Sequence, residues 1–279
     1  MTTLITGVRG QVGRTVLDRL HAAGLPVRAA SKAPADLTLP AGVEVAELRL
    51  DAPETFGPAL DGARQVFLYA EPAGIDTFVT AARAAGVDHI VLLSSSAVDS
   101  PTAADNPIGA RHLAVENALA ASGILTTVLR PGGFDSNSLS WARAIAGKQP
   151  VELPYPEAAL AMIHPGDIAD IAVAALTGPE LRGRTVSLTG PEAVSFERQI
   201  ALLGEALGRD IPVVRVSPEQ AARQMSVTMP AFIVDTLLTT WATLADTPQP
   251  VADTTETLLG VPARSYAQWA RENAAAFSA

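Results

Sequence analysis

The sequence predicts an α/β fold, with a doubly wound parallel sheet followed by a smaller, mostly helical C-terminal region. Two observations support this prediction. Short apolar segments alternate with amphipathic segments of helical length from residue 3 to residue 129, and this alternation is typical of β-α-β units. The apolar segments are nearly unbroken, which fits strands that are buried on both faces of a parallel sheet.

Six strands and four helices are expected in this first part of the chain. The strands are placed at residues 3–5, 26–30, 43–48, 65–70, 89–93 and 125–129. The helices are placed at residues 12–23, 54–60, 74–85 and 108–122. Three of these helices are followed by a glycine, Gly24, Gly86 or Gly123, which is a common way for a helix to end.

After Pro131 the alternation becomes less regular. We expect helices at 167–176 and 196–207, strands at 184–188 and 212–216, and mostly helical structure from residue 218 onward. The chain is therefore divided into a first domain, residues 1–150, and a smaller region, residues 151–279, which is expected to interleave partly with the sheet.

The composition excludes several classes of function. The 279 residues are 48% hydrophobic and 18% charged, which is typical of a globular protein, and the net charge of −9 disfavours binding to nucleic acid or to anionic membranes. The chain has no cysteine, so thiol catalysis, disulfides and thiolate metal sites are excluded. Neither a signal peptide nor a long apolar span is visible, so we expect a cytoplasmic protein.

The segment Thr6-Gly7-Val8-Arg9-Gly10-Gln11-Val12-Gly13 follows the first strand and opens the first helix. Gly7 permits a tight turn, Gly10 lets the backbone approach a pyrophosphate, and Gly13 lets the helix pack closely. The start of the helix supplies N–H donors and the positive end of its dipole. This Rossmann arrangement predicts a bound dinucleotide. Cofactor binding is assigned to Thr6, Gly7, Arg9, Gly10, Gln11, Val12 and Gly13, and to Ala70 at the end of the fourth strand.

The end of the second strand favours NADP(H) over NAD(H). An acidic residue there would accept from the ribose 2′-hydroxyl, but there is none from residue 25 to residue 35. Arg28, Ser31 and Lys32 suit a 2′-phosphate instead, unless the two cations are simply solvated loop charges. Asp51, after the third strand, either accepts from the adenine amino group or caps a helix, and the two roles can coexist.

Polar side chains also follow the fifth strand. Ser94, Ser95 and Ser96 can bond a nicotinamide or a substrate carbonyl, or alternatively their own backbone. His112 and Glu116 lie one turn apart on the next helix, as an acid–base pair or as a surface ion pair. Arg130 is considered as a buried ion-pair partner. With only four histidines and little ligand-like spacing, we expect no metal site.

Taken together, these segments resemble the NmrA-like group of atypical short-chain dehydrogenases/reductases over nearly the whole chain. The resemblance is carried by residues 6–13, 27–34, 91–95, 112–116, 128–137 and 163–169. It implies an NAD(P)-binding Rossmann domain at 1–150 and a substrate-binding region at 151–279. Lys32 falls where relatives often hold the NADP phosphate, and Ser95 or Ser96 falls near the usual catalytic serine.

The resemblance also shows a departure. His112 falls where the superfamily places a lysine that touches the nicotinamide ribose, and Ile108 falls where it places the catalytic tyrosine. Ile108 cannot donate a proton, so the catalytic candidates are Ser95, Ser96 and His112, with Ser94 and His112 also assigned to the cofactor. The resemblance implies that Phe134, Asn137 and Trp141 border the substrate pocket. Phe134 and Trp141 are equally candidates for core packing.

The leading hypothesis is an NADPH-dependent oxidoreductase that reduces a small to medium apolar carbonyl, quinone or enone. One alternative is an NADP(H)-binding redox sensor without catalysis, since NmrA-like proteins include regulators. Another is a cofactor-dependent enzyme without net redox, such as an epimerase. The expected partner is a small-molecule substrate, and a homodimer is left open.

Overall fold

The computed structural model describes residues 2–278 and divides the chain into two compact units. Unit 1 comprises Met1–Asp105, Gly109–Pro131 and Pro165–Ser187. Unit 2 comprises Asn106–Ile108, Gly132–His164 and Leu188–Ala279. The predicted boundary at residue 150 differs from this division, because the chain leaves unit 1 at Pro131 and later returns to it with one helix and one strand.

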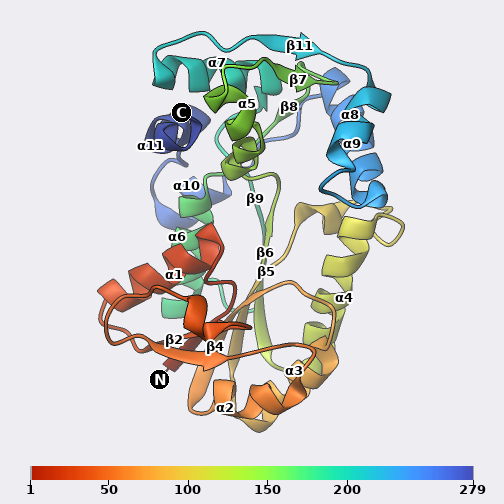
Figure 1. Ribbon diagram of the computed structural model, residues 1–279. Helices are drawn as coiled ribbons and strands as arrows, with labels where there is room; N and C mark the ends of the chain where they lie inside the picture. Colours follow the sequence, from red (N-terminus) through yellow and green to blue (C-terminus); the bar gives the residue numbers. More distant parts are fainter. Residues whose placement is uncertain (1, 279) are drawn as a thin grey trace. The chain divides into compact units, whose positions relative to one another are not determined.

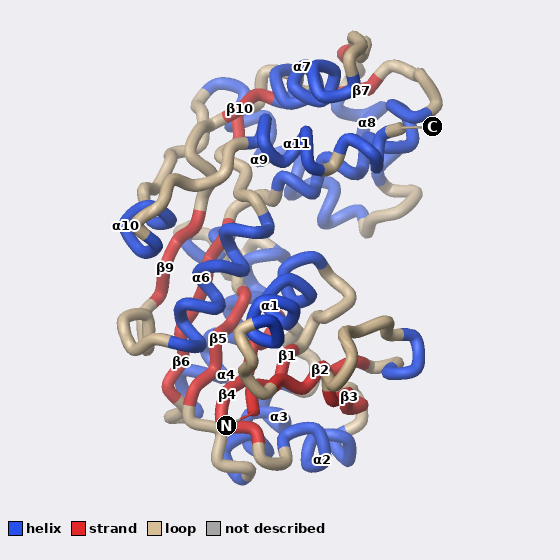
Figure 2. Tube along the Cα trace, turned by 90° about the vertical axis from the view of Figure 1, so that its left-hand side faces the viewer, coloured by secondary structure: helices blue, strands red, loops and turns tan. Residues whose placement is uncertain are grey.

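Unit 1 contains a seven-stranded sheet in the order β3-β2-β1-β4-β5-β6-β9 (Figure 2). The first six strands in this order, β3, β2, β1, β4, β5 and β6, pair in parallel. Their bounds are Thr2–Ile5 for β1, Val27–Ser31 for β2, Glu44–Glu47 for β3, Ala63–Tyr69 for β4, His89–Leu93 for β5, Leu125–Pro131 for β6 and Thr185–Leu188 for β9. This sheet confirms the predicted fold class. The strand order reverses between β1 and β4, where open α/β sheets bind their ligands.

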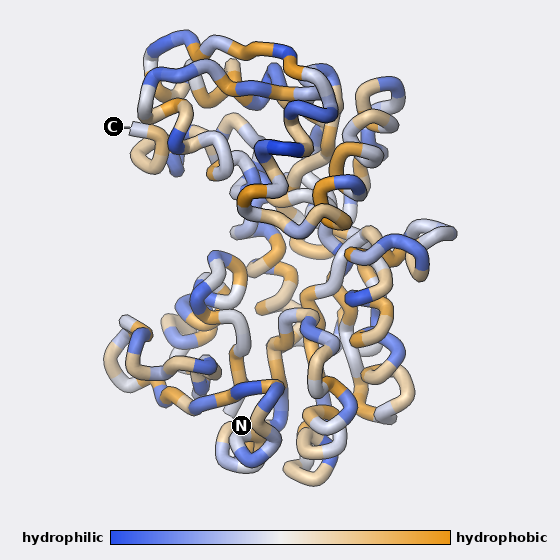
Figure 3. Tube along the Cα trace, turned by 45° about the vertical axis from the view of Figure 1, so that its right-hand side comes forward, coloured by the Kyte–Doolittle hydropathy of each residue, from blue (hydrophilic) through white to orange (hydrophobic). Residues whose placement is uncertain are grey.

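Helices cover both faces of this sheet (Figure 1). α1 (Gln11–Ala22) and α6 (Pro165–Thr177) pack together on one face, whereas α3 (Ile75–Ala84) and α4 (Pro107–Ser122) lie on the other. The short α2 (Phe56–Leu60) joins α3 through an edge-to-face contact between Phe56 and Phe78, whose ring centroids are 5.6 Å apart. The apolar strands between these helices form the core, and Figure 3 shows hydrophobic residues along the sheet.

Three short 3-10 helices lie in the connections of unit 1. They are η1 (Pro34–Asp36), η2 (Pro53–Thr55) and η3 (Ser96–Asp99). The helix that the sequence predicts at 54–60 is split into η2 and α2, and Pro58 lies within α2. A proline has no N–H to donate, which limits the regular hydrogen bonding of so short a segment.

Segment 165–187 returns to unit 1 because α6 and β9 complete its layers. Val128 N of β6 donates to Arg184 O at 2.8 Å, immediately before β9. The side chains of α6 are buried on most of its faces, as expected for a helix that is enclosed by neighbouring elements.

Unit 2 is mostly helical and contains two small two-stranded sheets, β10-β8 and β11-β7. Its strands are β7 (Val151–Leu153), β8 (Ala159–Leu160), β10 (Val194–Ser195) and β11 (Val213–Arg215). Its helices are η4 (Asp135–Trp141), α5 (Ala142–Ala146), α7 (Phe196–Leu207), α8 (Pro218–Met225), α9 (Ala231–Asp246), α10 (Thr254–Leu259), α11 (Tyr266–Glu272) and η5 (Ala274–Phe277). Phe196 packs edge-to-face between Trp141 and Trp241, and these rings belong to the core of unit 2.

Residues 2–278 contain neither a membrane-spanning helix nor a metal-binding cluster. None of the helices in this range has both the length and the apolar run needed to cross a membrane. The same residues contain no cluster of three or more histidine or carboxylate side chains arranged to hold a metal ion.

Candidate functional site

The glycine-rich loop connects the end of β1 to the start of α1. Gly7 has a φ of 67°, a left-handed conformation that favours glycine, and its carbonyl accepts from Gly10 N at 2.9 Å. A Cβ atom on Gly13 would lie 2.5 Å from Gly7 O and 2.8 Å from Thr6 O. Gly7 is therefore required by the turn and Gly13 by the close packing of the helix, with or without a bound ligand.

Gly10 is different. A Cβ atom there would meet only Gly7 O, at 3.4 Å, which is ordinary van der Waals contact. Gly10 is the N-cap of α1 and has no side chain with which to cap it, and the first-turn N–H groups have no carbonyl partner within the helix. The loop therefore offers open space beside unshared donors and a positive helix end, which suits an anionic group.

The neighbouring side chains of the loop divide into two groups. The Thr6 hydroxyl donates to Phe67 O and accepts from Tyr69 N, both at 3.0 Å, so it holds the loop to β4. The Val12 side chain is buried in the core, which leaves only its backbone N–H for a ligand. Gln11 is exposed, and Ala70 packs partly buried against the core.

Tyr69 borders the same loop and was not predicted. Its Cδ1 atom would lie 3.5 Å from a Cβ atom on Gly7, and its side chain remains 42% exposed. Burial of the rest of the ring raises the pKa of its hydroxyl, and the carboxylate of Glu71 acts in the same direction. Only its position at the end of β4, directly before Ala70, could have identified it from the sequence.

The loop after β2 collects polar and charged groups. Ser31 Oγ accepts from Ala33 N at 3.1 Å, and Lys32 is exposed. Arg9 reaches this loop from the glycine-rich segment: its Nη2 atom donates to Ala33 O and to Asp36 Oδ2, each at 3.0 Å. The structure thus places Arg9 on the loop that carries Ser31 and Lys32.

Arg28, which was predicted to bind the cofactor, has other partners in the structure. Its guanidinium pairs with Glu44 at 2.9 Å and donates to the carbonyls of Ala59 and Asp61 at 2.9 and 2.6 Å. Ala59 and Asp61 lie at the C-terminal end of α2, where a cation complements unshared helix carbonyls. Arg28 is therefore a structural link near the start of β2, away from the ligand edge of the sheet.

Asp51 lies four residues beyond the end of β3, in an exposed loop. It does not cap the following helix, because η2 has Ala52 at its N-cap. The Arg49 guanidinium, 3.2 Å away, holds the pKa of Asp51 below its usual range, and the charge of Lys32 adds to the effect. Asp51 thus lies within electrostatic reach of the loop that carries Lys32.

A charged network joins the ends of β5 and β6 to α4. Ser94 Oγ donates to Glu116 Oε1 at 2.5 Å, and Arg130 binds both oxygens of Glu116, at 3.1 and 2.5 Å. Arg130 also pairs with Asp99 at 2.6 Å, and Ser187 donates to that carboxylate at 3.2 Å. Arg130 is therefore the ion-pair partner that the sequence suggested, and it balances the charge of Glu116.

The remaining polar candidates at this edge are Ser95, Ser96 and His112. Ser95 Oγ accepts from Ala97 N at 3.2 Å and so caps η3, in which Ser96 is the first residue. His112 is half-buried on α4, one turn before Glu116. Ile108 lies one turn earlier still, and its backbone N donates to Asn106 Oδ1 at 2.9 Å.

The residues predicted to border the substrate belong to unit 2. Trp141 packs on Phe196 with ring centroids 5.8 Å apart, so its role in the core is the one the structure supports. Phe134 is half-buried and pairs through its backbone with Ile163. Asn137 is exposed at the start of η4, which leaves its amide accessible.

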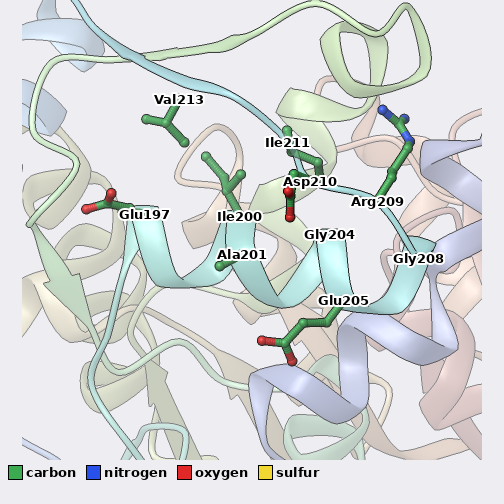
Figure 4. A pocket seen from close by; sticks show the side chains of 10 residues that line it. All are labelled: Glu197, Ile200, Ala201, Gly204, Glu205, Gly208, Arg209, Asp210, Ile211 and Val213. Carbon is green, nitrogen blue, oxygen red and sulfur yellow. The ribbon is translucent and has the colours of Figure 1, made fainter.

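Unit 2 also has a hollow of about 670 Å³ along one face of α7 (Figure 4). Ile200, Ala201 and Gly204 form its floor, and Ile211 and Val213 face them from the following segment. None of the residues that the sequence singled out lines this hollow, and the arginine beside it, Arg209, donates to the carbonyl of Ile145.

The comparison with protein families matches residues 7–179 to a family described as NAD(P)H-binding. The chain belongs to this NAD(P)H-binding family. The match begins at Gly7 in the glycine-rich loop and includes strands β2 to β6 and helix α6. The predicted membership of an NAD(P)-binding family is confirmed, and the family binds a nicotinamide cofactor.

Relatives and solved structures agree with membership of the NAD(P)H-binding family. The chain is 37% identical to (4-alkanoyl-5-oxo-2,5-dihydrofuran-3-yl)methyl phosphate reductase of Streptomyces griseus and 34% identical to NAD(P)H azoreductase of Xenophilus azovorans, in each case over 99% of both chains. Its fold matches NADPH-dependent quinone oxidoreductase QOR2 of Escherichia coli, complexed with NADPH, with a TM-score of 0.82, 23% identity and coverage of 98% and 99%. Triphenylmethane reductase of Citrobacter gives a TM-score of 0.81 at 20% identity, over 98% and 100% of the two chains.

The loop residues of this family member fit such a cofactor. The space beside Gly10 is not used by the protein itself, and Arg9 and Lys32 provide cations near it. Backbone donors at the start of a helix suit a pyrophosphate, and nearby cations suit phosphate groups in general.

Two of the tyrosines belong to different units. Tyr69 lies beside Gly7, whereas Tyr266 is buried in unit 2, where it donates to Ser138 Oγ at 2.7 Å and burial raises its pKa. Neither tyrosine lies on α4, where the family resemblance would place the acid. Neither Tyr69 nor Asp36 was among the residues that the sequence predicted.

Proposed function

We propose that the protein is an NADPH-dependent oxidoreductase that reduces small to medium, electron-poor conjugated acceptors such as quinones and enones. The observation that carries the cofactor assignment is Gly10. It borders space that the protein's own packing leaves open, next to the unshared donors of α1 and the cation Arg9.

In this proposal the backbone N–H groups of Gln11, Val12 and Gly13 hold the pyrophosphate. Lys32, Ser31 and Arg9 hold the 2′-phosphate, since cations and hydroxyls are suitable donors to its oxygens. Asp51, on the neighbouring loop, accepts from the adenine amino group. Arg28 has no part in binding, because its guanidinium is held by Glu44 and by carbonyls of the α2 end.

The choice of acceptor follows from the missing acid. The bound cofactor supplies a hydride, and reduction of a plain ketone then leaves an alkoxide, a strong base that needs a proton donor. Ile108 has no proton to give. Reduction of a quinone or an enone leaves a phenolate or an enolate, which spreads its charge over the conjugated system and needs a weaker acid. Ser95, Ser96 and His112 remain as donors for this smaller task.

The names of two relatives agree with this substrate class. One is called a reductase of an oxo-dihydrofuran that carries an alkanoyl group, and the other an azoreductase. Both acceptors are conjugated systems short of electrons, as the proposal requires. The two relatives align with nearly the whole chain, so the comparison includes unit 2 as well as the sheet.

Oxidation of NADPH, followed at fixed cofactor concentration with matched acceptors, tests the proposal. We expect turnover with quinones, enones and azo dyes, and rates at least a hundredfold lower with saturated ketones of similar size. Gly10→Ser serves as a control because its side chain occupies the open space beside the loop. Demonstrated NADPH binding without oxidation by any acceptor, or a preference for saturated ketones, would contradict the proposal.

The lack of an acid at Ile108 also favours a second candidate, a sensor of the redox state that binds the cofactor without turnover. Such a protein must bind NADPH and NADP⁺ with different affinities, since only a differential affinity shifts a conformational equilibrium. Calorimetric titration with the two forms separates this candidate from the enzyme when no acceptor is reduced.

A further inference from the structure

We propose that Asp36 is a specificity-determining residue. Its carboxylate pairs with the Arg9 guanidinium, the cation that we assign to the 2′-phosphate of NADPH, and so weakens the preference for NADPH over NADH. This inference rests on the proposed cofactor site. It concerns a residue that lies outside the strand end normally used to distinguish the two cofactors.

The geometry links the two segments directly. Arg9 Nη2 donates to Asp36 Oδ2 and to Ala33 O, each at 3.0 Å. Asp36 is the last residue of η1, which follows the loop of Ser31 and Lys32. The ion pair therefore holds the Arg9 guanidinium at the loop that we assign to the 2′-phosphate. The positive charge of Arg9 is already balanced there by the Asp36 carboxylate.

This ion pair is weak enough to be replaced. The side chains of Arg9 and Asp36 are 47% and 70% exposed, and exposed pairs of this kind contribute little to stability. A phosphate carries close to two negative charges and three acceptor oxygens, so it competes well for the same guanidinium. While it does so, the displaced carboxylate remains nearby and repels the phosphate.

The other charges around the loop do not offset this repulsion. The second cation, Lys32, lies within electrostatic reach of Asp51. Arg49 is hydrogen bonded to Asp51 and also interacts electrostatically with Glu47 and Glu54. Each cation near the loop therefore faces at least one carboxylate, and removal of Asp36 gives Arg9 to the phosphate without a competitor.

The variant Asp36→Asn tests the inference in binding rather than in turnover. We expect NADPH and adenosine 2′,5′-bisphosphate to bind about three- to tenfold more tightly at low salt, as estimated for a single charge near a phosphate in water. NADH and adenosine 5′-monophosphate should change by less than about twofold. Calorimetric titration of the full chain measures all four ligands.

The same substitution in an Arg9→Gln background completes a double-mutant cycle. There we expect the gain from Asp36→Asn to be clearly smaller than in the wild type, because only the direct repulsion between the carboxylate and the phosphate is relieved and Arg9 is no longer present to be released. Asp18→Asn is the matched control, since Asp18 also forms an exposed ion pair, with Arg14 on α1 at 2.9 Å. It should leave the ratio of the two affinities unchanged.

Three results would overturn the inference. They are equal effects on ligands with and without a 2′-phosphate, the same gain in the Arg9→Gln background, and weaker NADPH binding by Asp36→Asn. The proposed enzyme activity fails separately. If the protein binds NADPH and responds to these substitutions but reduces no acceptor, the inference stands and the oxidoreductase assignment falls.

Discussion

The three glycines of the α1 loop have different physical roles, and substitution can separate the roles of Gly13 and Gly10. Alanine at Gly13 would put a Cβ atom 2.5 Å from Gly7 O and 2.7 Å from Gly7 C, both backbone atoms that cannot rotate away. We expect Gly13→Ala to lower the free energy of unfolding by about 1–3 kcal/mol, the usual cost of overpacking. Denaturant titration measures this loss.

Gly10→Ser provides the contrast. Its Cβ atom has room, and serine is a favourable N-cap, so the stability should stay within about 0.5 kcal/mol of the wild type. NADPH affinity should nevertheless fall at least tenfold, because the new side chain fills the space beside the pyrophosphate donors. A Gly10→Ser protein that is stable and binds NADPH normally would remove the main support for the cofactor site.

His89 gives a prediction on pH dependence. It is fully buried at the start of β5, where its Nε2 atom bonds Thr127 Oγ1 at 2.9 Å, and burial lowers its pKa to about 4. Because the unfolded chain binds a proton near pH 6.5 and the folded protein does not, stability is lost as the pH falls from about 6.5 to about 4. The loss attributable to this group is at most about 3 kcal/mol.

The variant His89→Gln tests this assignment. Glutamine retains an N–H donor for Thr127, which itself donates to Leu181 O at 2.7 Å, but it does not titrate. We expect the variant to have a flatter dependence of unfolding free energy on pH between 4 and 6.5. Parallel curves for the two proteins would show that other groups cause the acid loss.

At the scale of elements, two glycines with left-handed conformations differ in what surrounds them. Gly74, the N-cap of α3, has a φ of 71°, and a Cβ atom there would lie 2.1 Å from Leu50 O. Gly24, after α1, has a φ of 72° and nothing within 4 Å. The first is a contact between two elements, and the second is only a local turn.

Alanine substitutions should separate these two roles. Gly24→Ala should cost about 1–2 kcal/mol, the strain of a left-handed residue with a side chain. Gly74→Ala should cost at least about 3 kcal/mol, because the chain after β3 must also move away from α3. Thermal unfolding of both variants measures the difference, and equal losses would mean that the loop at Leu50 yields freely.

Elements with a clear repeat were predictable from the sequence. The structure places α7 at Phe196–Leu207, the predicted range, because its apolar residues recur at helical spacing and Gly208 follows in a left-handed conformation. By contrast, β7, β8 and β10 have only two or three residues, which is too short for an alternation to be visible. The 3-10 helix η4 likewise lacks the spacing that marks an α-helix.

The candidate site was predictable only where local sequence determines local structure. The glycine loop depends on neighbours within seven residues, so its turn and helix start could be inferred. The fate of each cation depends on partners far along the chain: Arg28 is held by Ala59 and Asp61, and Arg9 by Asp36. Which carboxylate or carbonyl a long side chain reaches is decided by tertiary structure, and no spacing in the sequence reports it.

At the scale of the whole molecule, cofactor binding should stabilise unit 1. A ligand that binds only the folded state at about 100 times its dissociation constant adds about 2.7 kcal/mol to the free energy of unfolding. We therefore expect NADPH to slow hydrogen exchange in peptides that contain β1 and the start of α1, and in the loop at residues 31–36. Mass spectrometry of the wild type with and without NADPH measures this effect.

The Gly10→Ser variant is the control for this experiment, because the same addition of NADPH should slow its exchange clearly less than that of the wild type. Unaltered exchange at residues 7–13 in a wild-type protein that demonstrably binds NADPH would place the cofactor elsewhere. The rise in protection should also be greater with NADPH than with NADH, to the extent that Lys32 and Arg9 contribute to affinity.

The return of α6 and β9 to unit 1 also has a consequence for synthesis on the ribosome. When β6 has emerged, the strand that covers its outer edge has not yet been made, since β9 begins at Thr185. A nascent chain halted at residue 131 presents an unpaired apolar strand edge, which invites aggregation. Fragments for crystallography or expression should therefore extend beyond Leu188, because a shorter piece lacks the last strand of its own sheet.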